Sequence, residues 1–474
     1  MASIAVVGAG LTGLTAAYRL KQRGNRVVVY EASERIGGSI RSERREGYLA
    51  ELGPNTLATP AGPMAALLTE LGLDSSRVDA SPVARNRYII RRGRLVRLPL
   101  TPPELLTTRL LSNGAKLAIF GEPLVEAADR PLEESVAAFV RRRFNQEVVD
   151  YIANPFVTGI FAGDPEQLSV RHAMPQLHAL ERTHGSVMKA FVKAMKSDRA
   201  AGREPGSQAV ISFQNGLQEI PDALARELTA EVRLRAPVTQ LRRGSHGWTV
   251  GAAFQTPELY DAVIYAAPAH ALDEIDLDFP GAERLSTLSS IVHPPVAVLA
   301  LGFRRDQVSH PLDGFGFLVP EVERRRVLGA VFSSSVFPER APAGHVMLTV
   351  FLGGTRDPDL VHADHQTMVA RVLDDLRSLL GTRGEPTYRA VQVWPKAIPQ
   401  YVLGYGRFKE IADDIERRNP GLLLAGTYRD GIALGDAVRS AEQAAVRASQ
   451  LLGVGEPATS VQHPVRSMSG AGPD

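Results

Sequence analysis

The stretch "IAVVGAGLTGLTAAYRLKQRGNRVVVYEASERIGG", residues 4–38, decides the fold of this chain. The apolar run at residues 4–7 predicts a buried parallel strand, and residues 14–23 have the amphipathic pattern of a helix. A second apolar run at residues 27–30 is followed directly by the acidic residue Glu31. The turn between the first strand and the helix has the spacing G-x-G-x-x-G, formed by Gly8, Gly10 and Gly13. This order of features is typical of a βαβ unit that binds a dinucleotide.

The glycines and the acid each have a physical task in such a unit. Gly8 permits a tight turn, Gly10 lets backbone amides approach a pyrophosphate at the helix N-terminus, and Gly13 lets the helix pack closely on the strand. The Glu31 carboxylate can accept hydrogen bonds from ribose hydroxyls and repels a 2′-phosphate, which argues against NADP. On these residues alone, the choice between NAD and FAD stays open.

Composition limits the class of protein. The chain has 474 residues, which favours two or three domains, and its 44% hydrophobic and 22% charged residues are typical of a globular protein. It has no apolar run of the roughly 18 to 20 residues that a membrane span needs, and its start lacks the basic region of a signal peptide. We therefore expect a cytoplasmic protein. Because the chain has no cysteine, it has no disulfide, no thiolate metal site and no flavin tethered through cysteine, and we expect no metal.

Two clusters of arginine stand out against the net charge of +2. Residues 84–97 carry six arginines and no acid, whereas residues 141–143 are three arginines in a helical pattern that predicts a solvated helix face. A nucleic-acid-binding protein usually has a broader basic excess, so we expect no nucleic-acid partner.

Nucleotide-fold signals recur near the start, the middle and the end of the chain, which predicts one domain assembled from separated segments. The predicted fold class is α/β plus α+β: a discontinuous Rossmann-like dinucleotide-binding domain, a mixed-sheet substrate domain and a helical insertion. The dinucleotide domain is expected at residues 1–80, 205–275 and 415–453, the substrate domain at 81–102 and 276–414, and the helical domain at 103–200. Residues 86–98 predict a β-hairpin around Gly93, residues 365–380 predict a helix, and the polar tail 454–474 is expected to be disordered.

The stretch "EASERIGGSIRS", residues 31–42, resembles the flavoprotein superfamily of amine oxidases, phytoene desaturases and protoporphyrinogen oxidases. There an acid is followed by R-x-G-G and a nearby arginine, matched by Arg35, Gly37, Gly38 and Arg41. The strand, loop and helix at residues 421–452 resemble the superfamily's second pyrophosphate and flavin contact. The resemblance covers most of the chain and implies that the dinucleotide is FAD, bound without a covalent link.

The resemblance also implies which residues contact FAD. Asp436 would hydrogen-bond the ribityl chain, the Val438 backbone would touch the flavin ring, and the Val238 backbone would bracket adenine, while residues 51–55 would lie beside the isoalloxazine. The full implied set is Gly8, Gly10, Leu11, Thr12, Gly13, Glu31, Ala32, Arg35, Gly37, Gly38, Gly53, Pro54, Asn55, Val238, Trp394, Gly426, Asp436 and Val438.

Five ordered stretches resemble the protoporphyrinogen oxidases in particular: residues 158–170, 313–320, 333–340, 349–354 and 398–405. The resemblance implies oxygen-dependent, six-electron oxidation of protoporphyrinogen IX to protoporphyrin IX in heme biosynthesis, by hydride transfer to FAD and reoxidation by O2 to H2O2. This substrate is a large apolar macrocycle with two propionates, so it needs an apolar pocket with an anion anchor. The family's last stretch normally ends in Gly-His, but here it ends in Gly404-Tyr405, which puts any role of that histidine in doubt.

Candidate substrate residues follow from that chemistry and the resemblance. Arg87 matches the family's substrate arginine and can bind a propionate bidentately, Asn55 can donate another hydrogen bond, and the Gly316 carbonyl is implied near the reacting carbon. We identify no side-chain base. The apolar candidates are Phe315, Leu318, Phe351 and Ile398.

Three other functions remain open at this stage. Oxidation of coproporphyrinogen III to coproporphyrin III is kept open by the arginines of residues 85–97, because that substrate has four carboxylates. An amine oxidase would place a lysine near the flavin and an aromatic pair at the substrate, and neither signature is found. A non-catalytic porphyrin carrier would not need the segments beside the flavin ring.

The resemblance also implies partners. Residues 103–125 are amphipathic, which suits peripheral contact with the inner face of the cell membrane and equally suits a helix packed on its own core. A homodimer and a hand-off of the product to ferrochelatase are further expectations.

Overall fold

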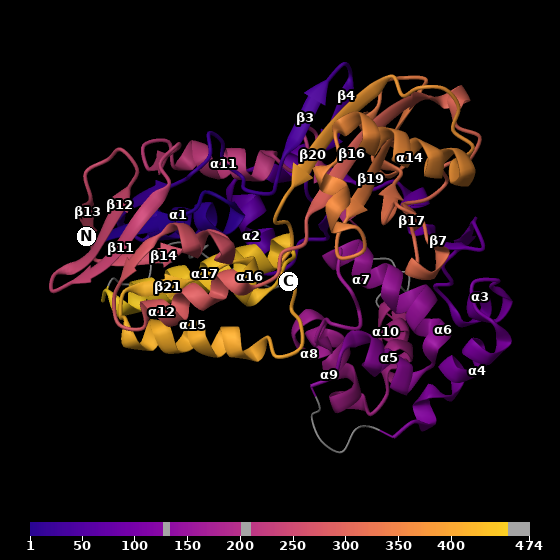
Figure 1. Ribbon diagram of the computed structural model, residues 1–474, viewed down its shortest axis with the longest axis horizontal. Helices are drawn as coiled ribbons and strands as arrows, with labels where there is room; N and C mark the ends of the chain where they lie inside the picture. The colour runs from indigo at the N-terminus through magenta and orange to yellow at the C-terminus, as the bar shows by residue number, and fades with distance from the viewer. Residues whose placement is uncertain (127–132, 201–209, 454–474) are drawn as a thin grey trace, which may run out of the picture.

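The computed structural model describes residues 1–126, 133–200 and 210–453, so the tail expected at 454–474 lies outside the described residues. Figure 1 shows three parts: a nucleotide-binding domain on the left, a sheet domain at the upper right and a helical domain at the lower right. This arrangement of a parallel-sheet domain, a mixed sheet and a helical insertion confirms the predicted fold class.

The nucleotide-binding domain is built on a five-stranded parallel sheet with the order β10-β2-β1-β14-β21. Its strands come from three distant segments, and most are continuous apolar runs because the sheet is covered on both faces. All carboxyl ends therefore meet at one edge. The strands are β1 (Ser3–Val7), β2 (Arg26–Tyr30), β10 (Val232–Arg233), β14 (Ala262–Tyr265) and β21 (Leu422–Leu424).

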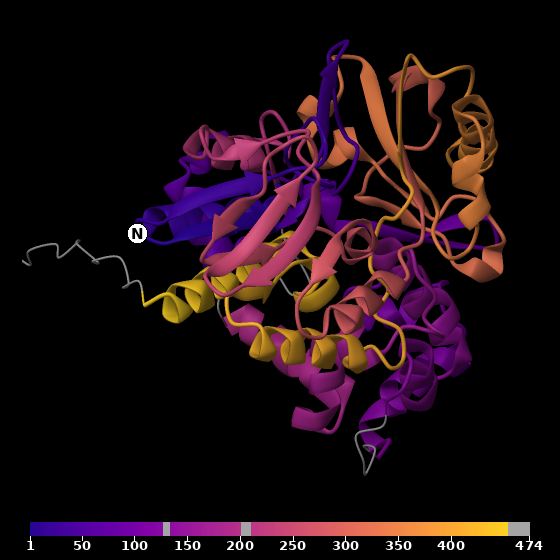
Figure 2. The same ribbon diagram turned by 60° about the vertical axis from the view of Figure 1, so that its left-hand side comes forward.

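Helices cover one face of this sheet, and a second sheet with further helices covers the other. On the first face, Leu14, Leu224 and Ala441 belong to one buried cluster, from α1 (Leu11–Gln22), α11 (Glu219–Glu227) and α17 (Leu434–Leu451), with α2 (Pro63–Glu70) beside them. The second sheet, seen at the front of Figure 2, contains β11 (Val238–Gly244), β12 (Gly247–Ala252), β13 (Glu258–Tyr260) and β15 (Asp276–Asp278). A small sheet is formed by β5 (Leu57–Ala58), β6 (Arg77–Asp79) and β9 (Val210–Phe213).

The boundary expected at residue 414 differs from the structure. It falls inside α15 (Gly406–Arg418), whose Phe408, Ala412 and Ile415 are buried in the cluster that contains strands β14 and β21. The short helix α12 (Ala282–Ser286) belongs to the same cluster. Because the apolar face of α15 packs as one unit, the whole helix belongs to the nucleotide-binding domain.

The sheet domain has seven strands in the order β20-β16-β19-β18-β17-β7-β8, parallel between β7 and β17 and antiparallel elsewhere. The predicted hairpin and helix are both confirmed, the hairpin turning at Gly93 with φ of 70° and the helix being α14 (His365–Leu380). The strands are β7 (Arg87–Arg91), β8 (Arg94–Arg97), β16 (Val296–Arg304), β17 (Gly316–Leu318), β18 (Gly329–Val331), β19 (His345–Gly353) and β20 (Tyr388–Trp394).

A hairpin from the first segment joins the two domains. It consists of β3 (Ser42–Arg45) and β4 (Tyr48–Glu51), and Tyr48 stacks on Tyr388 with ring centroids 4.7 Å apart. The hairpin leads directly into the turn at residues 52–55, so the sheet domain fixes the position of that turn. The short helices α13 (Ser333–Val336) and α16 (Thr427–Asp430) complete these two domains.

The helical domain packs around a core that includes Phe139, Val157, Phe161 and Leu168. Among the described residues, no helix has the length and apolar character required to cross a bilayer. The helices are α3 (Pro102–Thr107), α4 (Asn113–Gly121), α5 (Val136–Arg143), α6 (Gln146–Val148), a π-helical turn (Val149–Ala153), α7 (Asn154–Phe161), α8 (Val170–Ala173), α9 (Pro175–His184) and α10 (Val187–Ala200).

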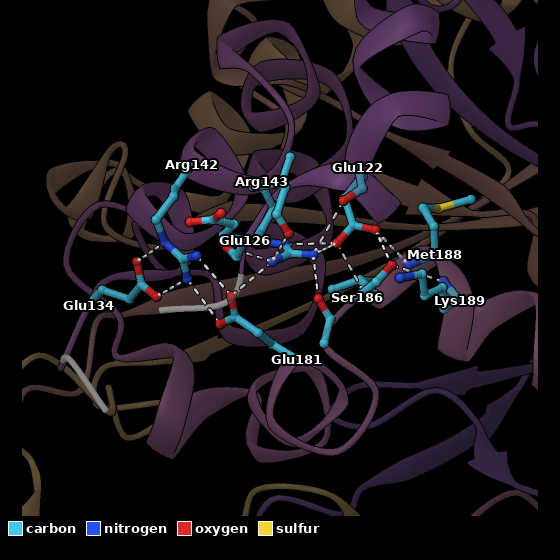
Figure 3. A network of polar contacts seen from close by, with 12 residues as sticks. Glu122, Glu126, Glu134, Arg142, Arg143, Glu181, Ser186, Met188 and Lys189 are labelled. Carbon is cyan, nitrogen blue, oxygen red and sulfur yellow. Dashed lines mark hydrogen bonds and ion pairs between the residues drawn. The ribbon is translucent and has the colours of Figure 1, made fainter. Parts of the chain in front are cut away.

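The prediction of a solvated face at residues 141–143 is wrong for Arg143, which is only 1% exposed (Figure 3). Arg143 donates from Nε to Glu122 Oε1 at 2.7 Å and from Nη1 to Glu181 Oε1 at 3.0 Å. Glu122, also fully buried, accepts the backbone amides of Val187 and Met188 at 3.0 Å each, at the start of α10. Burial raises the pKa of Glu122, but the hydrogen bonds from Ser186, Arg143 and these two amides outweigh it and hold the pKa below its ordinary value.

Candidate functional site

The glycine-rich turn after β1 leaves room for a ligand at the carboxyl edge of the parallel sheet. Gly8 has φ of 101°, and a Cβ there would lie 3.0 Å from Ala267 N, at the end of the neighbouring strand β14. A Cβ on Gly13 would lie 1.9 Å from Gly8 O, so only glycine lets α1 start this close to β1. The N-cap of α1 is Gly10, which offers no side chain to its first-turn amides. The amides of this turn, Leu11 and Thr12 among them, fit a pyrophosphate.

Glu31 lies at the end of β2 with its carboxylate fixed by two backbone amides. Ala9 N donates to Oε2 and Ser33 N donates to Oε1, both at 2.8 Å. Each carboxylate oxygen has a second lone pair, so both can still accept ribose hydroxyls. The neighbouring Ala32 is exposed, and Ala236 N donates to Glu31 O at 2.8 Å, which brings the buried Val238 segment to this edge.

The second glycine pair runs beside the first. Gly37 N donates to Ala9 O at 2.8 Å, and a Cβ on Gly38 would lie 3.2 Å from Gly10 Cα. A side chain at Gly38 would therefore fill the space between the two loops. This cradle, together with the open helix terminus and Glu31, fits a dinucleotide cofactor.

Arg35 braces the second glycine loop rather than pointing away from it. Its Nη1 donates to the carbonyls of Ile36 at 3.1 Å and Ile40 at 3.0 Å, and its guanidinium lies 5.8 Å from the ring of Trp394. Burial and the nearby Arg41 lower the pKa of Arg35. The structure thus gives Arg35 a role in shaping the loop.

The C-terminal segment returns to the same edge. Gly426 follows β21 with φ of 122°, and its N–H donates to Ser440 Oγ at 2.9 Å. Asp436 Oδ2 accepts Ala433 N at 3.2 Å and so caps α17. The backbone contact of Val438 with the flavin stays a prediction; its side chain is fully buried in the core, and it follows Ala437, whose amide donates to Ala433 O. The amides that helix geometry leaves unpaired at this terminus include those of Leu434 and Gly435.

The turn at residues 52–55 is held by both domains. Trp394 Nε1 donates to Leu52 O at 2.8 Å, and Asn55 Nδ2 donates to Gly53 O at 2.9 Å across Pro54. A Cβ on Gly53 would lie 1.8 Å from Ser39 O, so this turn runs directly along the glycine loop. The predicted flavin-ring residues are thereby joined to the predicted substrate sheet.

Arg87 begins β7, paired with Gly316 of β17. Its guanidinium lies 5.2 Å from the centroid of the Phe315 ring, and burial lowers its pKa. Within the described ranges, no carboxylate forms an ion pair or hydrogen bond with the Arg87 side chain. A Cβ on Gly316 would lie 2.0 Å from Ala330 O, so a side chain there would break the β17–β18 pair.

The predicted apolar residues fall into three clusters. Leu318 and Ile398 pack against the helical-domain cluster, whereas Phe351 packs against a small cluster that contains Ala162 and Val298. Phe315 lies in a separate cluster with Phe337 and Val331. Val331 and Phe337 also line a small cavity with Asn55, which places the Phe315 cluster next to the 52–55 turn.

Sequence reasoning missed the face of α7 that meets this sheet. A Cβ on Gly159 would lie 2.7 Å from Leu318 Cδ2, so the helix and strand are in contact there. Phe156 and Ile160, on the same side of α7, are large apolar side chains that remain exposed. Gly159 and Ile160 lie three and four residues after Phe156, and this helical spacing was the available signal.

Tyr405, where the family pattern has histidine, is fully buried and donates its hydroxyl to Tyr428 O. It packs in the core of the nucleotide-binding domain. This residue therefore stabilises the fold.

Comparisons with known proteins identify the family of this chain. Residues 11–449 match the family model described as flavin containing amine oxidoreductase. Protoporphyrinogen oxidase 2 of Arabidopsis thaliana is 36% identical, over 93% of this chain and 92% of that protein, and human protoporphyrinogen oxidase is 33% identical, over 94% and 98%. The solved structure of a protein from Exiguobacterium sp. 255-15 has the same fold, with a TM-score of 0.79 at 24% identity over 95% of this chain and 99% of that one.

The glycine cradle, its closure by the C-terminal segment and this similarity over nearly the whole chain lead to one assignment. The chain belongs to the flavin-containing amine oxidoreductase family, groups with its protoporphyrinogen oxidases, and is a flavin-dependent oxidoreductase enzyme.

Proposed function

We propose that this enzyme oxidises protoporphyrinogen IX to protoporphyrin IX in heme biosynthesis, with FAD bound non-covalently and O2 as the electron acceptor. The named activity of the relatives and the absence of cysteine support this proposal. A bound flavin supplies the redox chemistry, with three two-electron oxidations of the macrocycle matched by reduction of three O2 to three H2O2.

The observation that carries the proposal is Arg87, a cation in the sheet domain that has no ion-pair partner in the described part of the chain. A half-buried guanidinium has lost part of its hydration, and this loss costs free energy unless an anion pairs with the group. A propionate of the substrate supplies that anion, and the fork of the guanidinium matches a carboxylate bidentately.

The number of available cations favours a substrate with two carboxylates over one with four. Arg91 is paired with Glu147 at 2.7 Å and lies 4.2 Å from the Tyr151 ring, so it is already neutralised. Arg97 lies 3.8 Å from Glu104. The arginines of this hairpin had left oxidation of coproporphyrinogen III open as an alternative function. Of these, Arg91 and Arg97 are engaged in structural contacts, and Arg92 and Arg94 lie around the turn of the hairpin.

The rest of the site orients the macrocycle and excludes water. The apolar side chains of Leu318, Phe351 and Ile398 provide walls for a ring system, and Asn55 offers an amide beside the 52–55 turn. We assign the Gly316 carbonyl to the neighbourhood of the reacting carbon and assign no side chain as a base.

Anaerobic titration tests the proposed function. The purified protein should be yellow, release FAD on denaturation, and lose flavin absorbance when protoporphyrinogen IX is added without oxygen. Coproporphyrinogen III should reduce the flavin more slowly. Reduction only by coproporphyrinogen III would favour the alternative, and reduction by neither would rule out both oxidase activities.

We also propose peripheral contact with a membrane, on the inner face of the cell membrane. Four apolar side chains of α3, α4 and the turn after α4 remain exposed, and Lys116 lies on the same segment. These side chains are Leu106, Leu117, Phe120 and Leu124. Co-sedimentation with anionic lipid vesicles tests this contact, and recovery of all the protein in the supernatant would exclude it.

A further inference from the structure

The junction between α7 and the sheet domain is held by a residue to which the proposed reaction assigns no role. Figure 1 shows α7 beneath the sheet that contains β17 and β19. Gly159 of α7 meets Leu318 of β17 here, and Phe351 of β19 lies five residues before Arg356. We propose that Arg356 is a positioning residue that sets the spacing between α7 and β17, and thereby whether the site prefers the smaller vinyl or the larger propionate substituents of a porphyrinogen. This inference rests on the proposed function.

Arg356 bridges the two walls with its guanidinium. Nη1 donates to Val319 O at 2.7 Å, directly after Leu318, while Nη2 donates to Thr158 Oγ1 at 2.9 Å, directly before Gly159. Gly159 and Leu318 are in contact, and Arg356 binds the residue next to each of them. A shift of either wall would break one of these hydrogen bonds.

Asn154 extends this bridge at the start of α7. Its Oδ1 accepts Arg356 Nη2 at 2.7 Å and Glu321 N at 2.9 Å, and its Nδ2 donates to Glu321 Oε2 at 3.1 Å. At the other end of α7, Thr355 N donates to Ala162 O at 2.8 Å. Contacts from the Thr355–Arg356 segment therefore fix both ends of α7 relative to the sheet.

The chemistry of this bridge favours a geometric role. The hydrogen-bond partners of Arg356 in the described residues are neutral oxygens, and burial lowers its pKa to about 10, offset in part by the more distant Glu321 and Asp164. Its Nε is buried and has no partner within the described ranges. A buried cation held this way gains little stability, but its rigid, planar guanidinium fixes the positions of three acceptors relative to one another. Lysine cannot reproduce that arrangement.

Arg325 provides a matched control on the opposite face of the same sheet. It follows β17 and precedes β18, and its Nη1 donates to Ser378 Oγ at 2.8 Å and Asp375 Oδ1 at 3.3 Å on α14. It too joins the sheet to a helix, but it does so away from α7.

The test compares Arg356→Met with Arg325→Met in the full-length, flavin-loaded enzyme. For Arg356→Met we expect the KM for protoporphyrinogen IX to rise about tenfold, and the ratio of kcat/KM between proto- and coproporphyrinogen to fall by a similar factor, with flavin content unchanged. Binding of protoporphyrin IX, followed by fluorescence quenching without turnover, should weaken in parallel. Arg325→Met should change neither KM nor this ratio.

Two milder variants keep the test informative if Arg356→Met folds poorly. Thr158→Val removes one acceptor with little change in shape and should raise KM by about twofold to fivefold. Arg356→Lys keeps the charge and should leave KM raised. If the wild-type enzyme oxidises neither porphyrinogen, the proposed function fails; if it does, and Arg356→Met, Arg356→Lys and Thr158→Val all keep the wild-type KM and ratio, this inference fails.

Discussion

Arg87, which is half-buried, and Arg143, which is fully buried, lie in different domains and have opposite surroundings. Arg143 lies among the carboxylates of Glu122 and Glu181 and several carbonyls of the helical domain (Figure 3). Arg87 lies over the Phe315 ring in the sheet domain and, in the described part of the chain, has no anionic partner.

The difference separates a structural charge from a binding charge. A buried cation whose donors all have hydrogen-bond partners holds neighbouring helices together. Its removal leaves a buried carboxylate without a counter-ion. A partly desolvated cation that has no anionic partner lowers the stability of the fold. A ligand that supplies the anion restores this free energy when it binds. The two arginines should therefore respond to substitution in opposite ways.

The largest effect is expected for Arg143→Met. Glu122 would lose its counter-ion inside the protein, so the free energy of unfolding should fall by about 3–5 kcal/mol. Chemical denaturation, with limited proteolysis to locate the loosened domain, measures this. Arg141→Met, which removes a pair with the exposed Glu166, is the control and should cost less than about 1 kcal/mol. Equal stability of the two variants would contradict the structural role of Arg143.

A smaller effect, on binding rather than folding, is expected for Arg87→Met. The loss of a bidentate contact to a propionate should raise KM for protoporphyrinogen IX about tenfold to hundredfold, because a hydrogen bond to a charged group contributes about 1.5–3 kcal/mol. The flavin content should stay the same, and the free energy of unfolding should stay the same or increase slightly. Steady-state kinetics and thermal unfolding measure both, and lost stability with unchanged KM would show that Arg87 is structural.

The smallest effect is expected for Glu122→Gln, and it concerns how the free energy of unfolding depends on pH. The pKa of Glu122 is lowered on folding, so its ionised form contributes stability above its unfolded pKa of about 4.3, and this contribution is lost as the pH falls through the folded pKa. The variant should be less stable than wild type at pH 7, and the gap should narrow toward about pH 3. Urea unfolding at several pH values measures this, with Glu166→Gln as an exposed control. A gap that is independent of pH would mean that ionised Glu122 contributes nothing.

Much of the fold and of the cofactor site is predictable because its signals are local. The strand-turn-helix at residues 3–22, the hairpin around Gly93 and the helix at residues 365–380 each follow from patterns within a few turns of chain. Gly8 and Gly13 are required by contacts within one βαβ unit and its neighbour, so their spacing carries the information. Local pattern is less informative at Val438, because whether a backbone amide is free for a ligand depends on the residue at which α17 begins.

By itself, the sequence predicted a dinucleotide-binding βαβ unit, since turn geometry and hydrophobic period are local properties, and a family resemblance predicted that the far end of the chain completes the site. Only the tertiary structure decided which arginines are paired. Arg143 belongs to a run that reads as solvated, yet its partner Glu122 lies 21 residues away in sequence. Arg356 meets Thr158 and Asn154 across 198 and 202 residues. Electrostatic pairing depends on distances in space, and the packing of distant segments sets those distances.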